Sequence, residues 1–158
     1  MDVRMHYLIP LKTAFAPEAE ESPERRAVRL RLTDWILFRE YWDEGADLGA
    51  LAAKAGVPRE EVSSFLWECY GERFYTVRKR LRIADAKALL IKRSEMSLSS
   101  VSRTVGFQDK SDFRRAFREE TGCSPKLWRE NGGSIVRCRI SQILEKGRNR
   151  FRDSRTNA

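Results

Sequence analysis

The chain has 158 residues, of which 41% are hydrophobic and 34% are charged, and its formal net charge is +8 at pH 7. This length allows one compact domain or two small ones, and no apolar run approaches the roughly 20 residues that a membrane span needs. The start of the chain is not typical of a signal peptide. Cys69, Cys123 and Cys138 form no CxxC pair and no zinc pattern, so we expect no metal or other cofactor, reduced thiols and a cytoplasmic protein.

Positive charge is concentrated in the second half of the chain. Residues 1–71 carry 9 basic and 13 acidic side chains, whereas residues 72–158 carry 22 basic and 10 acidic side chains. The two balances, −4 and +12, suggest that the second half faces a polyanion. A basic surface that is simply solvated is the alternative.

Apolar residues at helical spacing predict an all-α fold, and no segment of any length shows the alternation of a strand. Residues 1–23 end in the acidic, Pro-containing stretch APEAEESP, and we expect them to form a flexible lead-in or a linker remnant. Ser22 and Pro23 suit the N-cap and first position of a helix that continues up to Gly45.

Six further helices are expected, over residues 48–55, 59–70, 73–93, 98–105, 110–121 and 125–130. Residues 132–158 form a basic extension with 7 basic and 2 acidic side chains. This extension is expected to hold one short helix around residues 136–146 and a disordered end.

An internal repeat is the most informative feature of the sequence. LGALAAKAGVPREEVSSFLWECYG at 48–71 aligns with LSSVSRTVGFQDKSDFRRAFREETG at 98–122, with one extra residue in the second turn. Each copy predicts a short helix, a turn and a longer helix, with a small residue, Ala52 or Ser102, where the helices approach closely. This is the layout of a helix-turn-helix. A single copy is typical of any helical hairpin, but two copies joined by a helical connector are far more specific.

The longer helices of the two copies differ on the faces opposite their apolar stripes, which comprise Val62, Phe65, Leu66 and Cys69 in the first and Phe113, Ala116 and Phe117 in the second. The outer face of the first copy carries Glu60, Ser63, Ser64 and Trp67. The outer face of the second carries Lys110, Ser111, Arg114, Arg115 and Arg118, after a predicted N-cap at Asp109.

Three arginines on one helix face suit binding to duplex DNA. An α-helix fits the major groove, and a planar guanidinium binds guanine through two hydrogen bonds or grips phosphates. The alternative is a solvated face, with ion pairs to Glu119 and Glu120. Trp67 also has two interpretations: contact with thymine methyls, sugars or phosphates, or packing against the connector or the first long helix.

The connector at 73–93 carries an apolar stripe of Phe74, Val77, Leu81, Ala84 and Ala88. A helix of about 18 residues spans roughly 27 Å, which is the right order to hold two recognition helices near one DNA turn, about 34 Å, apart. Its basic side chains Arg78, Lys79 and Arg82 are expected either to contact the DNA backbone between two half-sites or to form a solvated face. Because both recognition helices lie in one chain, we expect binding to DNA as a monomer.

LRIADAKALL at 81–90 and VSRTVGFQDKSDFRRAFREETGCSPKLWR at 101–129 together resemble the C-terminal DNA-binding domain of the AraC/XylS transcription activators. The resemblance implies a seven-helix domain over residues 24–131, with two helix-turn-helix units that bind successive major-groove segments. It also implies an activator that contacts RNA polymerase. By position, it places contacts at Glu60, Ser63, Ser64 and Trp67 in the first unit and at Lys110, Ser111, Asp112 and Arg115 in the second.

An enzyme is not expected, because the only histidine is His6 and no nucleophile–base pair or metal cluster is visible. The alternative function is a helical protein-interaction module whose basic face docks an acidic partner. Binding to a specific duplex that survives excess competitor DNA would distinguish the regulator from such a module.

Overall fold

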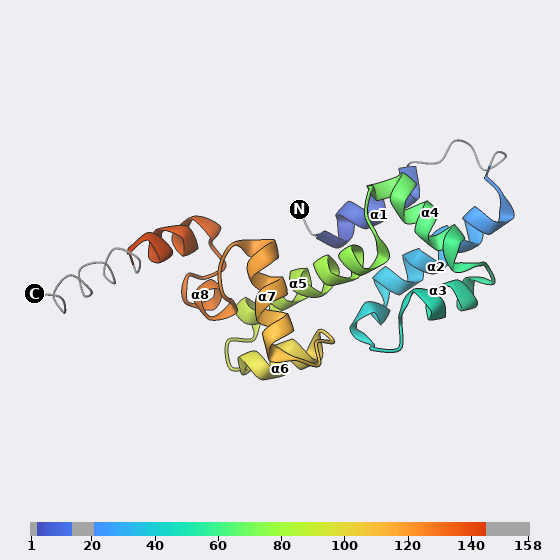
Figure 1. The fold of residues 1–158 in the computed structure, drawn as a ribbon. Helices are drawn as coiled ribbons and strands as arrows, with labels where there is room; N and C mark the ends of the chain where they lie inside the picture. Colours follow the sequence, from blue (N-terminus) through green and yellow to red (C-terminus); the bar gives the residue numbers. More distant parts are fainter. Residues whose placement is uncertain (1–2, 14–20, 145–158) are drawn as a thin grey trace, which may run out of the picture. The chain divides into compact units, whose positions relative to one another are not determined.

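The computed structural model describes residues 3–13 and 21–144, and in these residues it contains helices and turns but no strand (Figure 1). The helices are α1 (Val3–Thr13), α2 (Pro23–Leu37), the 3-10 turn η1 (Glu40–Trp42), α3 (Leu48–Ala55), α4 (Arg59–Tyr70), α5 (Phe74–Lys92), α6 (Leu98–Thr104), α7 (Lys110–Thr121) and α8 (Pro125–Glu130). The all-α prediction is confirmed, and the six helices expected between residues 48 and 130 are all present, with bounds that differ by no more than about one residue.

The described residues fall into two compact units. The first comprises the chain up to Asp85 together with Thr104–Gly106, and the second comprises Ala86–Arg103 and the chain from Phe107 onward. The α3–α4 pair belongs to the first unit and the α7 helix to the second.

The N-terminal segment is helical over residues 3–13, so the prediction of a flexible lead-in is wrong there; residues 14–20 lie outside the described residues. Tyr7 and Leu8 are buried in the core of the first unit. The Tyr7 hydroxyl donates to Glu72 Oε2 at 2.7 Å, and the Tyr70 hydroxyl donates to the Tyr7 carbonyl at 2.7 Å. Burial raises the pKa of Tyr7, so its hydroxyl remains a donor over the physiological range.

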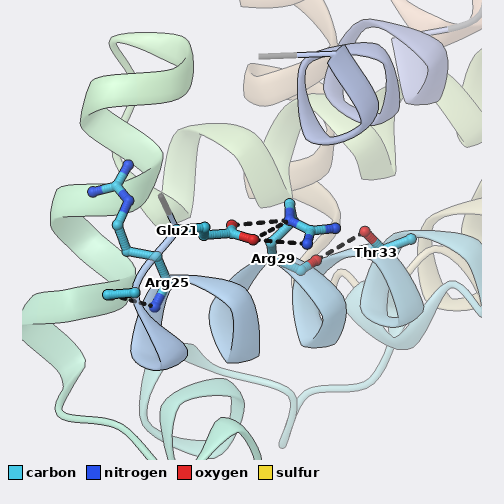
Figure 2. Close-up of polar contacts among 5 residues, drawn as sticks. Glu21, Arg25, Arg29 and Thr33 are labelled. Atoms are coloured by element: carbon cyan, nitrogen blue, oxygen red, sulfur yellow. Dashed lines mark hydrogen bonds and ion pairs between the residues drawn. The ribbon is translucent and has the colours of Figure 1, made fainter. Parts of the chain in front are cut away.

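Helix α2 begins where its capping residues predict. Ser22 Oγ accepts from the Arg25 amide at 3.3 Å, and Pro23 is the first helical residue. Figure 2 shows the Glu21 carboxylate beside the Arg29 guanidinium, with Arg29 Nη2 donating to Glu21 Oε2 at 2.8 Å. This hydrogen bond lowers the pKa of Glu21, and it ties the residue before the cap to the second turn of the helix.

The same helix ends at Leu37 and does not continue to Gly45. Arg39 adopts a left-handed backbone, with φ of 55°, which breaks the helix before the short turn η1. As a result Tyr41 is fully buried, whereas Trp42 is only half-buried.

The buried face of α5 changes along the helix. Phe74, Val77 and Leu81 are buried as predicted, but Ala84 is half-buried and Ala88 is exposed. The residues buried further along are Ile83, Ala86 and Leu90, which lie on nearly the opposite side at about 100° per residue. The prediction of one continuous stripe is wrong because the two ends of α5 belong to different units.

After Gly133, residues 135–144 are helical, which agrees with the short helix expected around 136–146; residues 145–158 lie outside the described part of the chain. Cys138 faces inward, and Gln142 Nε2 donates to the Gly122 carbonyl at 2.8 Å. Burial and a hydrogen bond with Cys123 raise the pKa of the Cys138 thiol to about 12. All three cysteines are free thiols.

Gly106, in the turn after α6, is predicted to tolerate no side chain. Its φ is +92°, and an added Cβ would lie 2.1 Å from the Trp42 carbonyl oxygen. Gly122 has a similar φ of +75° but nothing within 4 Å of an added Cβ. We expect Gly122→Ala to lower the free energy of unfolding by about 1 kcal/mol, from backbone strain alone. Gly106→Ala should lower it by about 3 kcal/mol or more, because a backbone clash is added.

Urea unfolding followed by circular dichroism would measure both values. Equal losses for the two variants would show that the packing of Gly106 against the Trp42 carbonyl has no energetic weight.

Candidate nucleic-acid interface

Helix α7 presents a polar face because its cap and its apolar stripe fix its orientation. Asp109 Oδ1 accepts from the amides of Ser111 at 2.6 Å and Asp112 at 3.0 Å, and these backbone hydrogen bonds lower the pKa of the Asp109 carboxyl. Phe113 and Phe117 are buried. The predicted outward residues are therefore all exposed, namely Lys110, Ser111, Asp112, Arg114, Arg115 and Arg118.

The cations of this face are mostly without a partner in the structure. Arg115 Nη2 lies 2.5 Å from Asp112 Oδ1, and both side chains are exposed to solvent. Within the described residues, no carboxylate pairs with Lys110, Arg114 or Arg118. The alternative of a solvated face with ion pairs to Glu119 and Glu120 stays a prediction. An anion that approaches α7 meets charges that are available for binding.

Helix α4 presents the predicted face of the first repeat. Val62, Phe65 and Leu66 are buried, and the four predicted contact residues are exposed, namely Glu60, Ser63, Ser64 and Trp67. Trp67 is 62% exposed, so most of its surface lies in solvent and is not packed against the connector or the first long helix. A large apolar surface left in water at this position is typical of a binding surface.

Two basic residues of α5 are not available for DNA. Arg78 is buried, and its guanidinium donates to the carbonyls of Tyr41, Asp43 and Glu44. Arg82 Nε donates to the Tyr41 carbonyl at 2.6 Å, and burial lowers the pKa of Arg82 to about 10. The expected contact of Arg78 and Arg82 with the DNA backbone is wrong, because both satisfy the carbonyls of the loop after α2. Lys79 is half-buried, and its contact with DNA stays a prediction.

Asp85 has a role that the sequence analysis did not assign. Its carboxylate is buried and accepts from the Tyr41 hydroxyl at 2.6 Å and from Trp42 Nε1 at 2.8 Å. Arg39 Nε lies 3.3 Å from the same carboxylate. The available signal was its isolation: Asp85 is the one acidic residue between Phe74 and Lys92, among many basic ones.

The described residues lack the features of two other kinds of site. No helix there is long and apolar enough to cross a membrane. The same residues contain no group of three or more His, Cys, Asp or Glu side chains that could hold a metal ion.

Two short-helix, turn and long-helix pairs with exposed polar faces define a helix-turn-helix class of protein. A family model described as a helix-turn-helix domain matches residues 51–131, about half of the chain. The chain belongs to this family, in the AraC type of DNA-binding domain.

Several known proteins are similar to it. The HTH-type transcriptional activator RhaR of Cronobacter sakazakii is 35% identical over 58 residues, which are 37% of this chain and 20% of RhaR. The arabinose operon regulatory protein of Escherichia coli is 31% identical over 87 residues, which are 55% of this chain and 30% of that protein. The chain thus spans about a fifth to a third of the length of these relatives.

A solved structure shares the fold. The C-terminal domain of AraT, a response regulator from Geobacillus stearothermophilus, superposes with a TM-score of 0.58 over 72% of this chain and 88% of that domain, at 20% sequence identity.

Replacing Arg78 is predicted to affect stability and not the affinity of the folded protein for DNA. Arg78→Met removes the donor to the Glu44 carbonyl and one of the two donors to each of the Tyr41 and Asp43 carbonyls. It should lower the free energy of unfolding by about 2–3 kcal/mol. Arg103→Met removes the same charge from an exposed position on α6 and should change it by no more than about 0.5 kcal/mol. Chemical denaturation measures both effects. A stable Arg78→Met protein with weakened DNA binding would restore the role in phosphate contact.

Proposed function

We propose that the chain binds a specific duplex sequence by placing α4 and α7 in two major-groove segments and thereby activates transcription. The observation that supports this most directly is the exposed face of α7, where Lys110, Arg114 and Arg118 have no carboxylate partner among the described residues. Unpaired cations on the face opposite a buried stripe match the polyanionic backbone of DNA.

Each residue of the α7 face has a proposed role. Arg115 reads a base edge, with guanine as the expected partner because its O6 and N7 accept both arms of a guanidinium. Asp112 holds this guanidinium at 2.5 Å in the free protein and thereby limits the orientations that Arg115 samples before binding. Lys110, Arg114 and Arg118 contact phosphates, and Ser111 donates to the backbone or to a base.

The α4 face is proposed to read sequence with less electrostatic attraction. Ser63 and Ser64 offer hydroxyls that donate to or accept from bases, and Trp67 packs on thymine methyls or sugars. Glu60 accepts from cytosine N4 or complements the positive end of the α4 dipole. This face carries one acidic and no basic side chain, so the electrostatic attraction of the protein to DNA phosphates comes mainly from α7.

Activation, contact with RNA polymerase and binding as a monomer are parts of the same proposal. The relative RhaR is named an activator, and both proposed recognition helices belong to one chain. The duplex partner is tested by selecting bound sequences from a random library, followed by footprinting and mass measurement of the complex. The expected result is one protein on a site of about 20 base pairs, retained in excess competitor DNA. Protection of one short segment, or two chains on a minimal site, would contradict it.

Substitutions on the two faces are predicted to have unequal effects. Arg115→Ala should cost about 1–3 kcal/mol of binding free energy and relax the preference at one base pair. Arg118→Ala should weaken all duplexes alike, as a phosphate contact does. Ser64→Ala should change the preference in the other half-site with little loss of affinity.

Titrations of matched and mismatched duplexes would measure these differences, with Lys126→Ala, on the exposed surface of α8, as the charge control. If Ser64→Ala abolished binding while Arg115→Ala bound every duplex like the parent, the α4 face would dominate and the assignment would be wrong.

A further inference from the structure

A small pocket lies beside the recognition helix of the second unit. Its volume is about 70 Å³, and it is lined by Ser99 and Ser102 of α6, by Lys110, Phe113 and Arg114 of α7, and by Pro125. The lining combines hydroxyls and two cations with an apolar wall. The volume accommodates a group of a few heavy atoms and no base, since a single water needs about 10–15 Å³ on this measure.

The hydroxyl of Ser102 is the first sign that this pocket takes a ligand. Ser102 is 2% exposed, and its Oγ has no hydrogen-bond partner. A buried hydroxyl without a partner is unfavourable and needs an explanation. At the matching position of the first repeat stands Ala52, which is equally buried at 2% exposure. Close packing of the two helices therefore requires only a small side chain, and the hydroxyl has another use.

The two cations are the second sign. Lys110 and Arg114 lie four residues apart on α7, where like charges repel. The carboxylates beside them in the sequence are engaged elsewhere: Asp109 caps the helix through two backbone amides, and Asp112 pairs with Arg115. An anion placed between Lys110 and Arg114 relieves this repulsion.

The first repeat fills the corresponding space with its own side chain. Gly49 matches Ser99 and Arg59 matches Lys110, and the Arg59 guanidinium lies so close that a Cβ on Gly49 would be 2.5 Å from Arg59 Nη2. A serine at this position would require the guanidinium to move away. In the second repeat the serine is present, the cation is a lysine, and the space is open.

From these observations we infer that the α6–α7 pocket is an oxyanion subsite that holds one phosphate group. Ser99 and Ser102 donate their hydroxyl protons to it, and Lys110 and Arg114 neutralise its charge. The inference rests on the proposed function in one respect, since a phosphate of the bound duplex is one source of the group. Free inorganic phosphate, competing with DNA for the same pocket, is the other source.

The duplex source is tested with the full chain and the selected operator, in which single phosphates are replaced in turn by neutral methylphosphonates. Ser102→Ala should lower operator affinity by roughly tenfold, as expected for loss of a hydrogen bond to a charged group. At one phosphate, the methylphosphonate and Ser102→Ala should each weaken binding, and together should weaken it no further. Ser100→Ala is the matched control, because this serine on the same helix hydrogen-bonds Ser97 and does not line the pocket.

The free-phosphate source is tested without DNA, by following backbone amide resonances during titration with inorganic phosphate at constant ionic strength. Saturable shifts at residues 99, 102, 110 and 114 that Ser102→Ala weakens and Ser100→Ala preserves would support the subsite even if no specific duplex were found. A combined effect of Ser102→Ala and one methylphosphonate that is smaller than the sum of the two single effects would support the subsite from the DNA-binding experiment. Additive effects at every phosphate together with no saturable shift would overturn it, and a gain in thermal stability of Ser102→Ala with unchanged binding would mark the hydroxyl as a packing defect only.

Discussion

The first unit depends on a polar clamp between α5 and the loop that follows α2. Buried charged groups are stable only when their hydrogen-bonding capacity is met. Here the donors and acceptors of α5 match the acceptors and donors of the loop. Arg78 and Arg82 supply donors to the carbonyls of residues 41–44, while the Asp85 carboxylate accepts from Tyr41 and Trp42. The left-handed residue Arg39 allows the chain to turn into this clamp. A loop that would otherwise leave carbonyls unpaired is thus held by one helix.

The clamp also reaches the turn of the second repeat. Gly106 lies against the Trp42 carbonyl and the Arg82 guanidinium, and residues 104–106 belong to the first unit while the helix after them belongs to the second. The start of the turn that precedes α7 therefore rests on the same carbonyls that Arg78 and Arg82 bind. Arg78 and Arg82 therefore act within the structure, by holding this loop.

The parts that the sequence predicted well are governed by local rules. The stripe of Phe113, Ala116 and Phe117, with Asp109 as cap, sufficed to orient α7, because helical spacing and capping are read from neighbouring residues. The predictions that are wrong concern residues whose interaction partners are distant in the sequence. Helix α1 is held by hydrogen bonds with Glu72 and Tyr70, which are more than 60 residues away in the sequence. An arginine that donates to backbone carbonyls also cannot be told apart, from the sequence alone, from one that is free to bind phosphate. Arg78 and Arg114 differ in the structure and not in residue type.

The two repeats separate what the scaffold requires from what recognition requires. Both bury aliphatic or aromatic residues at matching positions, such as Val62 and Phe113, and both end the long helix at a left-handed glycine, Gly71 or Gly122. Their outer faces diverge: α4 carries an acid, two hydroxyls and an exposed indole, whereas α7 carries four cations. Under the proposed function, counterion release would favour binding of the α7 cations to DNA of any sequence. The α4 face lacks such cations and would contribute only where its hydrogen bonds and apolar contacts match the bases. Specificity of the proposed complex would therefore require both faces to engage one duplex, since a DNA segment that binds α7 alone would gain little from α4.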